Sequence, residues 1–316
     1  MTRSEALRGA TAGALLAAAW LAGCGGGGGR LGYDAGASDA ALGDGPDAVT
    51  PLRVATWNVH DLFDSIDDPE MDMVLSPSEA TAKLAAVGRV VRAIDADVVV
   101  LEEVEKIEVL DALATGPLAG MGYEQRGLFE GNDPRGIDVA YLSRVPIDFA
   151  RTHAGDRFAS ADGTMTYAFS RDVLEIAPHP PSGRVLVLGA HLRSQLGGAD
   201  GDAHRLAEAL QIRRIVDDRI AAGAARIMVV GDLNDVPGSP SLDALVGDGV
   251  LVDLTDRVPL ADRWTYVYSG EQRVYDHALA NMTVADATTG VTILHGPEVD
   301  STSDHQPVIV DLLLAP

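Results

Sequence analysis

The sequence predicts an α+β fold in which β-sheets pack together and helices lie outside them. From residue 52 onward, many short apolar runs of strand length are separated by only a few segments of helical periodicity. A regular alternation of strand and helix is absent, which disfavours a doubly wound parallel sheet. The chain has 316 residues, enough for one large domain with an ample core.

The first 23 residues have the pattern of an export signal. Arg3 and Arg8 precede an uncharged run that is too short for a comfortable membrane span. The run ends at the only cysteine, Cys24, in LAGC, which resembles the bacterial lipoprotein box. We therefore expect cleavage before Cys24 and lipid attachment to it, which would place the protein in the cell envelope, at the outer membrane, in the periplasm or at the cell surface. A transmembrane anchor or an ordinary signal peptide is the alternative interpretation.

Residues 24–50 predict a flexible tether, because they are mainly Gly, Ala and Asp with almost no large apolar side chains. Residues 51–316 then form the folded catalytic domain. The chain has 24 basic and 47 acidic residues, a formal net charge of −23. Such a charge repels polyanions at long range and argues against tight nucleic-acid binding, although divalent cations could bridge the protein to a phosphate.

The predicted domain begins with a strand at 52–59, followed by a helix at 78–95 with Ser76 or Ser78 as its N-cap. A long amphipathic helix spans 202–223. The other predicted strands are apolar runs at residues 96–104, 136–143, 184–192, 226–233, 274–280 and 306–314.

Polar side chains that suit a metal or an anion recur at or near the ends of these predicted strands. They are Asn58, Glu103, His191, Asp232, Asn234, Asp276, Asp304 and His305. Asp232 and Asn234 lie two apart in VVGDLND, and residues two apart on an extended chain point the same way, so we expect them to share a site. Any one of these residues alone is ambiguous, because an aspartate after a strand is usually a turn former or a helix cap. The whole set favours one functional site.

Seven ordered motifs resemble those of the endonuclease/exonuclease/phosphatase superfamily. They are TWNVH, LEEVE, RGIDVAYLS, GAHLRSQ, GDLND, YDHALA and SDHQPV. The resemblance covers about residues 52–314. It implies a four-layer α/β/β/α sandwich of two mixed β-sheets flanked by helices, and hydrolysis of phosphodiester bonds with the help of a divalent cation.

The resemblance also implies a metal site. Asn58, Glu103 and Asp304 resemble the ligands, and their carboxylate and amide oxygens are hard donors that suit Mg²⁺ or Mn²⁺. The family usually has Gln before this glutamate, whereas this chain has Glu102. We expect Glu102 to face the opposite side of its strand.

Five further residues resemble the catalytic groups of the family. His305 matches the general base and Asp276 the carboxylate that orients it. Asp232 and Asn234 match the pair that contacts the scissile phosphate, and His191 matches the histidine that hydrogen-bonds the phosphoryl oxygens. An imidazole titrates near neutral pH, so His305 is chemically suited to accept a proton from water.

The substrate stays open, because all branches of this superfamily share these motifs. We expect a metal-dependent phosphodiesterase, with a nuclease as the first possibility. A phosphatase or phospholipase-C-like enzyme acting on small phosphoesters or lipid head groups is the alternative, and the acidic charge and lipid anchor favour it. A third alternative is a non-catalytic surface protein that keeps the fold for binding, which the complete set of motif residues disfavours. We expect a monomer that contacts the membrane only through its lipid.

Overall fold

The computed structural model describes residues 49–67 and 73–316. The predicted signal peptide, Cys24 and nearly all of the predicted tether lie outside the described residues. The chain divides into two units, Met1–Asp44 and Gly45–Pro316, and every described residue belongs to the second. Within the described ranges, no helix has the length and apolar character needed to cross a bilayer.

Two six-stranded mixed sheets form the centre of the domain. The first has the spatial order β15 (Thr288–Ile293), β16 (Val308–Leu314), β1 (Thr50–Leu62), β2 (Val98–Val104), β4 (Asp138–Ser143) and β3 (Gln125–Leu128). Its central pair, β1 and β2, is parallel, and its other pairs are antiparallel.

The second sheet has the spatial order β11 (Val252–Asp253), β14 (Asp276–Ala280), β10 (Ile227–Asp232), β9 (Leu186–His191), β8 (Val173–Pro178) and β5 (Ile147–Thr152). Here β10 and β9 are the parallel pair. Two short hairpins complete the strands: β6 (Phe158–Ala159) with β7 (Thr166–Tyr167), and β12 (Tyr266–Tyr268) with β13 (Glu271–Arg273).

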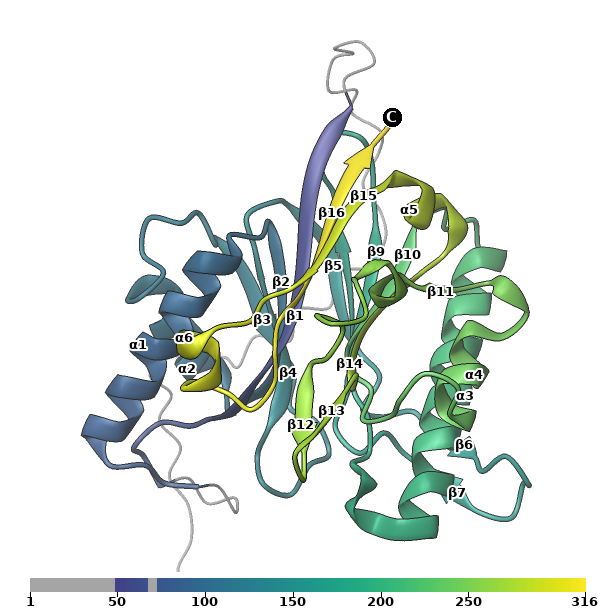
Figure 1. Ribbon diagram of the computed structural model, residues 1–316, viewed down its shortest axis with the longest axis horizontal. Helices are drawn as coiled ribbons and strands as arrows, with labels where there is room; N and C mark the ends of the chain where they lie inside the picture. Colours follow the sequence, from purple (N-terminus) through teal and green to yellow (C-terminus); the bar gives the residue numbers. More distant parts are fainter. Residues whose placement is uncertain (1–48, 68–72) are drawn as a thin grey trace, which may run out of the picture. The chain divides into compact units, whose positions relative to one another are not determined.

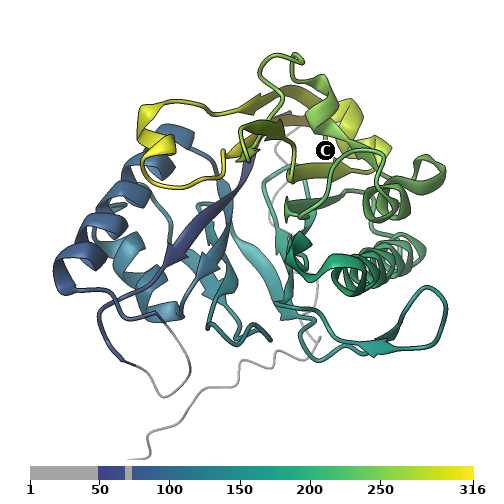
Figure 2. The ribbon, with the colours of Figure 1, turned by 60° about the horizontal axis from the view of Figure 1, so that its bottom comes forward.

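The helices cover the outer faces of the two sheets (Figures 1 and 2). On the first sheet lie α1 (Pro77–Ile94), α2 (Ile107–Thr115) and α6 (Pro297–Asp300), and on the second lie α3 (Gly198–Ala221) and α4 (Pro240–Val246). Helix α5 (Met282–Ala287) and the 3₁₀ turns η1 (Gln195–Gly197), η2 (Gly247–Gly249) and η3 (Leu254–Arg257) lie in connections.

Three clusters of buried apolar residues hold these layers together. One lies between the sheets and includes Val100, Val187 and Val230. A second packs α1 and α2 against the first sheet, and a third packs α3 and α4 against the second. The predicted four-layer α/β/β/α sandwich is therefore confirmed, and all three clusters lie within Gly45–Pro316.

Local sequence explains how α1 begins and ends. Ser76 is the N-cap: its hydroxyl accepts the Glu79 backbone N–H, and the Glu79 carboxylate accepts the Ser76 N–H. Pro77 at the first helical position and left-handed Asp95 after the last complete the boundaries. The two predicted helices and all seven predicted strands are present, each with ends within a few residues of the expected ones.

Candidate active site

Strand register alone places three of the predicted residues in one row. Because β9 and β10 are parallel, His191 at the end of β9 lies opposite Asp232 at the end of β10. Strand β14 pairs with β10 on the other side, which places Asp276 opposite Asp232. Neighbours across a sheet point to the same face, so the row forms one edge of a site.

A glycine makes this close approach possible. Gly231, just before Asp232, has a φ of +137°, a value that L side chains rarely adopt. A Cβ atom at Gly231 would lie 1.9 Å from the carbonyl oxygen of Ala190, which is far inside van der Waals contact. Any residue other than glycine here would therefore push the ends of β9 and β10 apart.

Residues of the first sheet meet this row directly. The amide Nδ2 of Asn58, on β1, donates to Glu103 Oε1 at 3.2 Å and to Asp232 Oδ2 at 3.1 Å. His191 Nε2 lies 3.5 Å from Asp232 Oδ2 and 3.9 Å from Glu103 Oε1. The two sheets thus contribute to a single cluster.

His305 completes the cluster from the loop before β16. Its Nδ1 donates to Asp276 Oδ2 at 2.8 Å, and its Nε2 lies 3.7 Å from Asp232 Oδ2. The ring also contacts Tyr266, with 4.6 Å between ring centroids. Since Asp276 occupies Nδ1, the free nitrogen of the ring is the one that faces Asp232.

Hydrogen bonds to β1 hold the loop of His305 in place. Ser303 Oγ donates to the Asn58 carbonyl oxygen at 2.7 Å and accepts the His305 backbone N–H at 3.0 Å. The indole Nε1 of Trp57 donates to the His305 carbonyl oxygen at 3.0 Å. These bonds fix the imidazole relative to Asn58.

Burial and charge shift the acidity of the central groups. Desolvation opposes the charged form of His305, but the carboxylates of Asp276 and Asp232 outweigh it and raise the pKa of His305 to about 10. Desolvation raises the pKa of Asp232 to about 7, against the favourable charge of His305. Burial, together with the charges of Arg171 and His305, lowers the pKa of His191 well below its usual value.

A second acidic group lies beside Glu103. Glu103, His60 and Asp61 all have left-handed backbones, with φ of +67°, +55° and +57°. The Asp61 backbone N–H donates to Glu103 Oε2 at 3.0 Å. Burial and then the Glu103 carboxylate raise the pKa of Asp61. His60 Nδ1 lies 2.8 Å from Oδ1 of Asp304, which brings this residue to the same side of the site.

This donor set fits a divalent cation. The Glu103 carboxylate lies close enough to disfavour ionisation of Asp61, a repulsion that a bound cation would relieve. Asn58 and Asp304 add oxygen donors nearby, and hard cations prefer such ligands. Asp232, Asp276 and His305 also offer atoms within 4.8 Å of one another, but Nδ1 of His305 is already bound to Asp276.

The structure bears on the expected positions of Asn234 and Glu102. Asn234 does not lie on an extended chain: its φ is +52°, so the alternation argument for Asp232 and Asn234 is wrong. The chain turns there because Asp232 Oδ1 accepts the Asn234 backbone N–H at 2.9 Å, and this turn keeps the two residues adjacent. Glu102 is fully buried and accepts the Thr56 hydroxyl at 2.6 Å, a different bond from those of Glu103, but the charges of Asp276, Asp232 and His305 also act on its carboxylate.

The sequence analysis did not identify His60 and Asp61. The predicted first strand stopped at residue 59, whereas β1 continues through Leu62 with two left-handed residues. The adjacent His–Asp pair after TWNV was the available signal. Arg135 was missed as well, although its guanidinium lies 3.8 Å from Asp61 Oδ1.

Comparisons with known proteins identify the family of this chain. The model of the Endonuclease/Exonuclease/phosphatase family matches residues 53–249. No curated protein sequence matches the chain.

Three solved structures illustrate the likeness of the fold. An endonuclease/exonuclease/phosphatase from Beutenbergia cavernae is 22% identical, with a TM-score of 0.59 over 84% of this chain and 72% of that one. The human Nocturnin catalytic domain is 14% identical, with a TM-score of 0.61 over 84% and 96%. A mannosyl-6-phosphatase from Bacteroides thetaiotaomicron is 16% identical, with a TM-score of 0.58 over 83% and 99%. The matched family model, the sandwich fold and the cluster around Asp232 lead to one conclusion: the chain belongs to the endonuclease/exonuclease/phosphatase family and is a metal-dependent phosphoesterase.

Proposed function

We propose that the protein hydrolyses phosphodiester bonds with Mg²⁺ or Mn²⁺, and that His305 is the general base. The observation that carries the proposal is the continuous series of contacts from Glu103 through Asn58 and Asp232 to His305 and Asp276. It brings hard oxygen donors and an oriented imidazole to one place, which in-line attack of water on a phosphate requires.

The residues of the proposed site have separate tasks. Without a cation, the carboxylates of Asp276 and Asp232 hold the pKa of His305 at about 10, so its imidazole is protonated at neutral pH. A divalent cation in the site would offset these negative charges and lower that pKa, so that Nε2 could accept a proton from the attacking water while Asp276 holds the ring in the tautomer that leaves Nε2 free. The low pKa of His191 keeps its imidazole neutral, so it acts as a hydrogen-bond donor to a phosphoryl oxygen rather than as a charge. Asn234 donates its amide to the same phosphate, and Asp232 is the candidate proton donor to the leaving oxygen, since its pKa is raised to about 7.

A divalent cation held by Asn58, Glu103 and Asp304 would neutralise charge on the nonbridging oxygens and favour departure of the leaving group. Water adds to phosphorus, the P–O bond to the leaving alcohol breaks, and the proton of water passes to His305. A single displacement of this kind inverts the configuration at phosphorus.

The proposal is tested with Gly45–Pro316 and bis-p-nitrophenyl phosphate. We expect hydrolysis with Mg²⁺ or Mn²⁺, loss of activity in EDTA, and loss of activity in His305→Ala. His295→Ala is the matched control, because among the described residues His295 bonds the Asp262 carbonyl oxygen and stacks on Trp264, away from the cluster around Asp232. Unchanged activity in His305→Ala would rule out the assigned base.

A nuclease is the first candidate for the substrate class. The second candidate, a hydrolase of small phosphoesters, is favoured by the net charge of −23, which opposes the approach of long polyanions. A fold shared with a mannosyl-6-phosphatase is compatible with it. Plasmid DNA, RNA, sphingomyelin, inositol phosphates and a sugar phosphate assayed side by side would distinguish the two.

Lipid attachment at Cys24 belongs to the proposal, with the enzyme anchored in the cell envelope. The support is the sequence LAGC at the end of an uncharged run that follows Arg3 and Arg8. Mass spectrometry of the protein isolated from membranes should find Cys24 as a lipid-modified N-terminus. An uncleaved, unmodified N-terminus would contradict the export signal.

A further inference from the structure

We propose that the domain has a second binding site, for an organic phosphate, in a pocket lined by arginines. The pocket has a volume of about 550 Å³ and lies between β5, the start of β9 and the end of α3. Every titratable residue in its lining is an arginine: Arg151, Arg184, Arg219 and Arg226. This site is separate from the proposed active site and does not depend on it.

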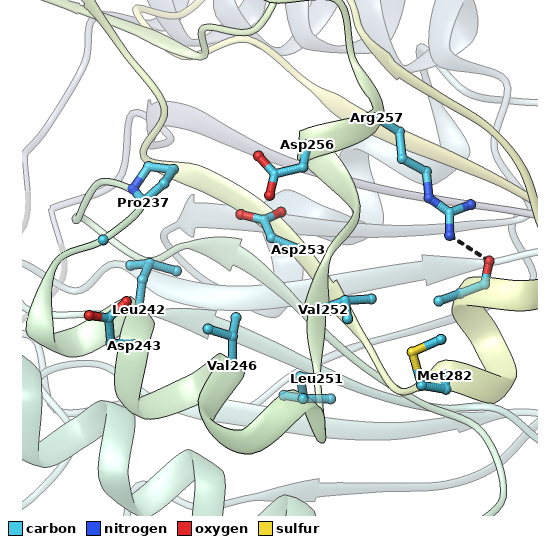
Figure 3. A pocket seen from close by; sticks show the side chains of 13 residues that line it. Pro237, Leu242, Asp243, Val246, Leu251, Val252, Asp253, Asp256, Arg257 and Met282 are labelled. Carbon is cyan, nitrogen blue, oxygen red and sulfur yellow. Dashed lines mark hydrogen bonds between the residues drawn. The ribbon is translucent and has the colours of Figure 1, made fainter.

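The concentration of arginine is unusual for this chain. Acidic residues outnumber basic ones by about two to one overall. A pocket of about 640 Å³ between α4 and α5 (Figure 3) is lined by Asp243, Asp253 and Asp256 with the single cation Arg257. The arginine-lined pocket is therefore positively charged in a chain whose composition is strongly acidic.

Nearby carboxylates neutralise only part of this charge. Glu175, which is fully buried, accepts two hydrogen bonds from Arg219 at 2.7 and 2.8 Å and lies 3.7 Å from Arg151. Asp148 pairs with Arg184. Among the described residues, two carboxylates thus form ion pairs with three of the four guanidinium groups. The charges of Asp156 and Asp218 also act on Arg219, and Glu175 also binds His153.

Among the four arginines of the pocket, Arg226 has the least of its positive charge neutralised. Its Nη1 donates to the Ser182 carbonyl oxygen at 2.7 Å and its Nη2 donates to the Ala315 carbonyl oxygen. It has no carboxylate partner among residues 49–67 and 73–316. Arg151 is held over the ring of Phe149, with 5.0 Å from Cζ to the ring centroid, and it is about half exposed. Both guanidinium groups keep N–H donors for a ligand.

The lining indicates the chemical class of that ligand. Planar guanidinium groups bind phosphate oxygens in pairs, and several of them together hold a phosphate better than a monovalent anion such as chloride. Phe149 and Leu186 add an apolar wall beside the arginines. A phosphate ester with a small organic group matches both parts of the pocket.

The pocket is far from the candidate active site. Leu186 is the first residue of β9 and His191 is the last, so at about 3.3 Å per residue the two ends of this strand are about 17 Å apart. A ligand in the pocket cannot contact His191 or Asp232, so it is not the scissile phosphate.

Two sources offer this chemistry: a phospholipid head group and a soluble organic phosphate. Arg226 bonds Ala315, and the neighbouring Leu314 pairs with Thr50 at the start of β1. The pocket therefore lies at the end of the domain where the chain enters it (Figure 1). If Cys24 carries lipid, a head group of the same membrane is within reach of this end.

The test uses Gly45–Pro316 labelled with ¹⁵N, without divalent cations so that substrate turnover does not interfere. sn-Glycerol 3-phosphate is titrated against sodium chloride of equal ionic strength, and the arginine Nε–Hε signals are followed by NMR. We expect signals of the pocket arginines to shift with glycerol phosphate, and Arg226→Gln or Arg184→Gln to weaken binding about tenfold. Arg214→Gln is the matched control, because Arg214 is exposed on α3, lies outside the lining of the pocket and, within the described ranges, bonds Gln211.

A second arm distinguishes the sources. The same proteins are sedimented with vesicles of phosphatidylcholine, with and without phosphatidylglycerol. Sedimentation that requires phosphatidylglycerol and Arg226 identifies a head group, whereas glycerol phosphate binding without sedimentation identifies a soluble ligand. The proposal is overturned if neither probe binds, or if Arg214→Gln weakens binding as much as Arg226→Gln. All variants should hydrolyse bis-p-nitrophenyl phosphate at the wild-type rate, and Arg184→Gln keeps the test decisive if Arg226→Gln fails to fold.

Discussion

Nδ1 of His305 and Oδ2 of Asp276 lie 2.8 Å apart, and both side chains are buried. Asp276 is itself positioned by Thr265, whose hydroxyl oxygen accepts the Asp276 backbone N–H at 3.0 Å. This bond holds the backbone from which the Asp276 carboxylate reaches the ring. Such a pair fixes which imidazole nitrogen is free to accept a proton.

Replacing Asp276 with Asn should lower kcat by about 10²-fold or more, because the amide can stabilise the wrong tautomer of His305 and supplies no charge to the imidazolium. KM should change little, because Asp276 does not contact the proposed phosphate position. Steady-state kinetics with bis-p-nitrophenyl phosphate measure both parameters, and circular dichroism checks the fold. A variant with wild-type kcat would show that Asp276 has no role in orienting the base.

Glu103→Gln should raise the Mg²⁺ concentration needed for half-maximal activity by about tenfold or more, since a neutral amide binds a divalent cation less well than a carboxylate. Activity should recover in part at saturating Mg²⁺. Metal titrations of the hydrolysis rate provide the measurement.

The neighbouring Glu102 supplies the control for this experiment. Burial raises the pKa of Glu102 well above its usual value, so a neutral Gln is close to its native state. Glu102→Gln should leave the metal requirement unchanged. A shifted requirement in Glu102→Gln but not in Glu103→Gln would reverse the two assignments.

Gly231→Ala should destabilise the domain by about 3 kcal/mol or more, because it combines a disfavoured backbone with a Cβ 1.9 Å from the Ala190 carbonyl oxygen. Gly238→Ala is the matched control: its φ is +82° and no atom lies within 4 Å of the added Cβ. It should lose only about 1–2 kcal/mol. Urea unfolding curves compare the two, and equal losses would show that the contact with Ala190 relaxes at no energetic penalty.

The stability of the domain should fall in mildly alkaline solution because of His277. Against desolvation, Asp253, 2.7 Å from Nδ1, raises the pKa of His277 to about 9. A raised histidine pKa stabilises the fold fully below the unfolded value of about 6.5, and this contribution is lost as the pH rises through about 9. For a fully buried group the loss is on the order of 3 kcal/mol.

This pH effect is isolated by comparing variants, because other buried groups also titrate in the range. The free energy of unfolding is measured in urea at about pH 6 and about pH 10. Wild type should lose more stability between the two than His277→Gln or Asp253→Asn. If wild type and both variants lost the same free energy of unfolding between these pH values, groups other than His277 would cause the pH dependence.

Much of the fold could be predicted because the central strands are long apolar runs. The missed strands have partners that sequence does not reveal. Strand β8 contains Glu175, a charged residue that interrupts its apolar run in the sequence. In the fold, Arg219 of α3 neutralises this carboxylate. The edge strand β5 and the hairpin β12–β13 are short and contain no buried residue, so they lack the continuous apolar run on which strand prediction depends.

The candidate site was predictable as a set of residues but not as a geometry. Strand ends indicated Asp232, Asp276 and His191, and register then placed them side by side. The contact between Asn58 and Asp232 joins residues 174 positions apart, and only the packing of the two sheets creates it. The left-handed turn at His60 is held by its N–H bond to Asn58 Oδ1, and the turn brings the Asp61 N–H to Glu103 Oε2, a contact between strands that the sequence does not reveal.

The bond from Asn58 to Asp232 has a consequence for how the enzyme should fail on heating. The cation ligands belong to one sheet and the phosphate-binding row to the other, so chemistry depends on their relative alignment. If the two intact sheets shifted by about one ångström relative to each other, the attacking water and the phosphorus of the substrate would no longer be aligned. On heating, the enzymatic activity is therefore expected to fall before the secondary structure melts. Molecules inactivated in this way should regain activity on cooling.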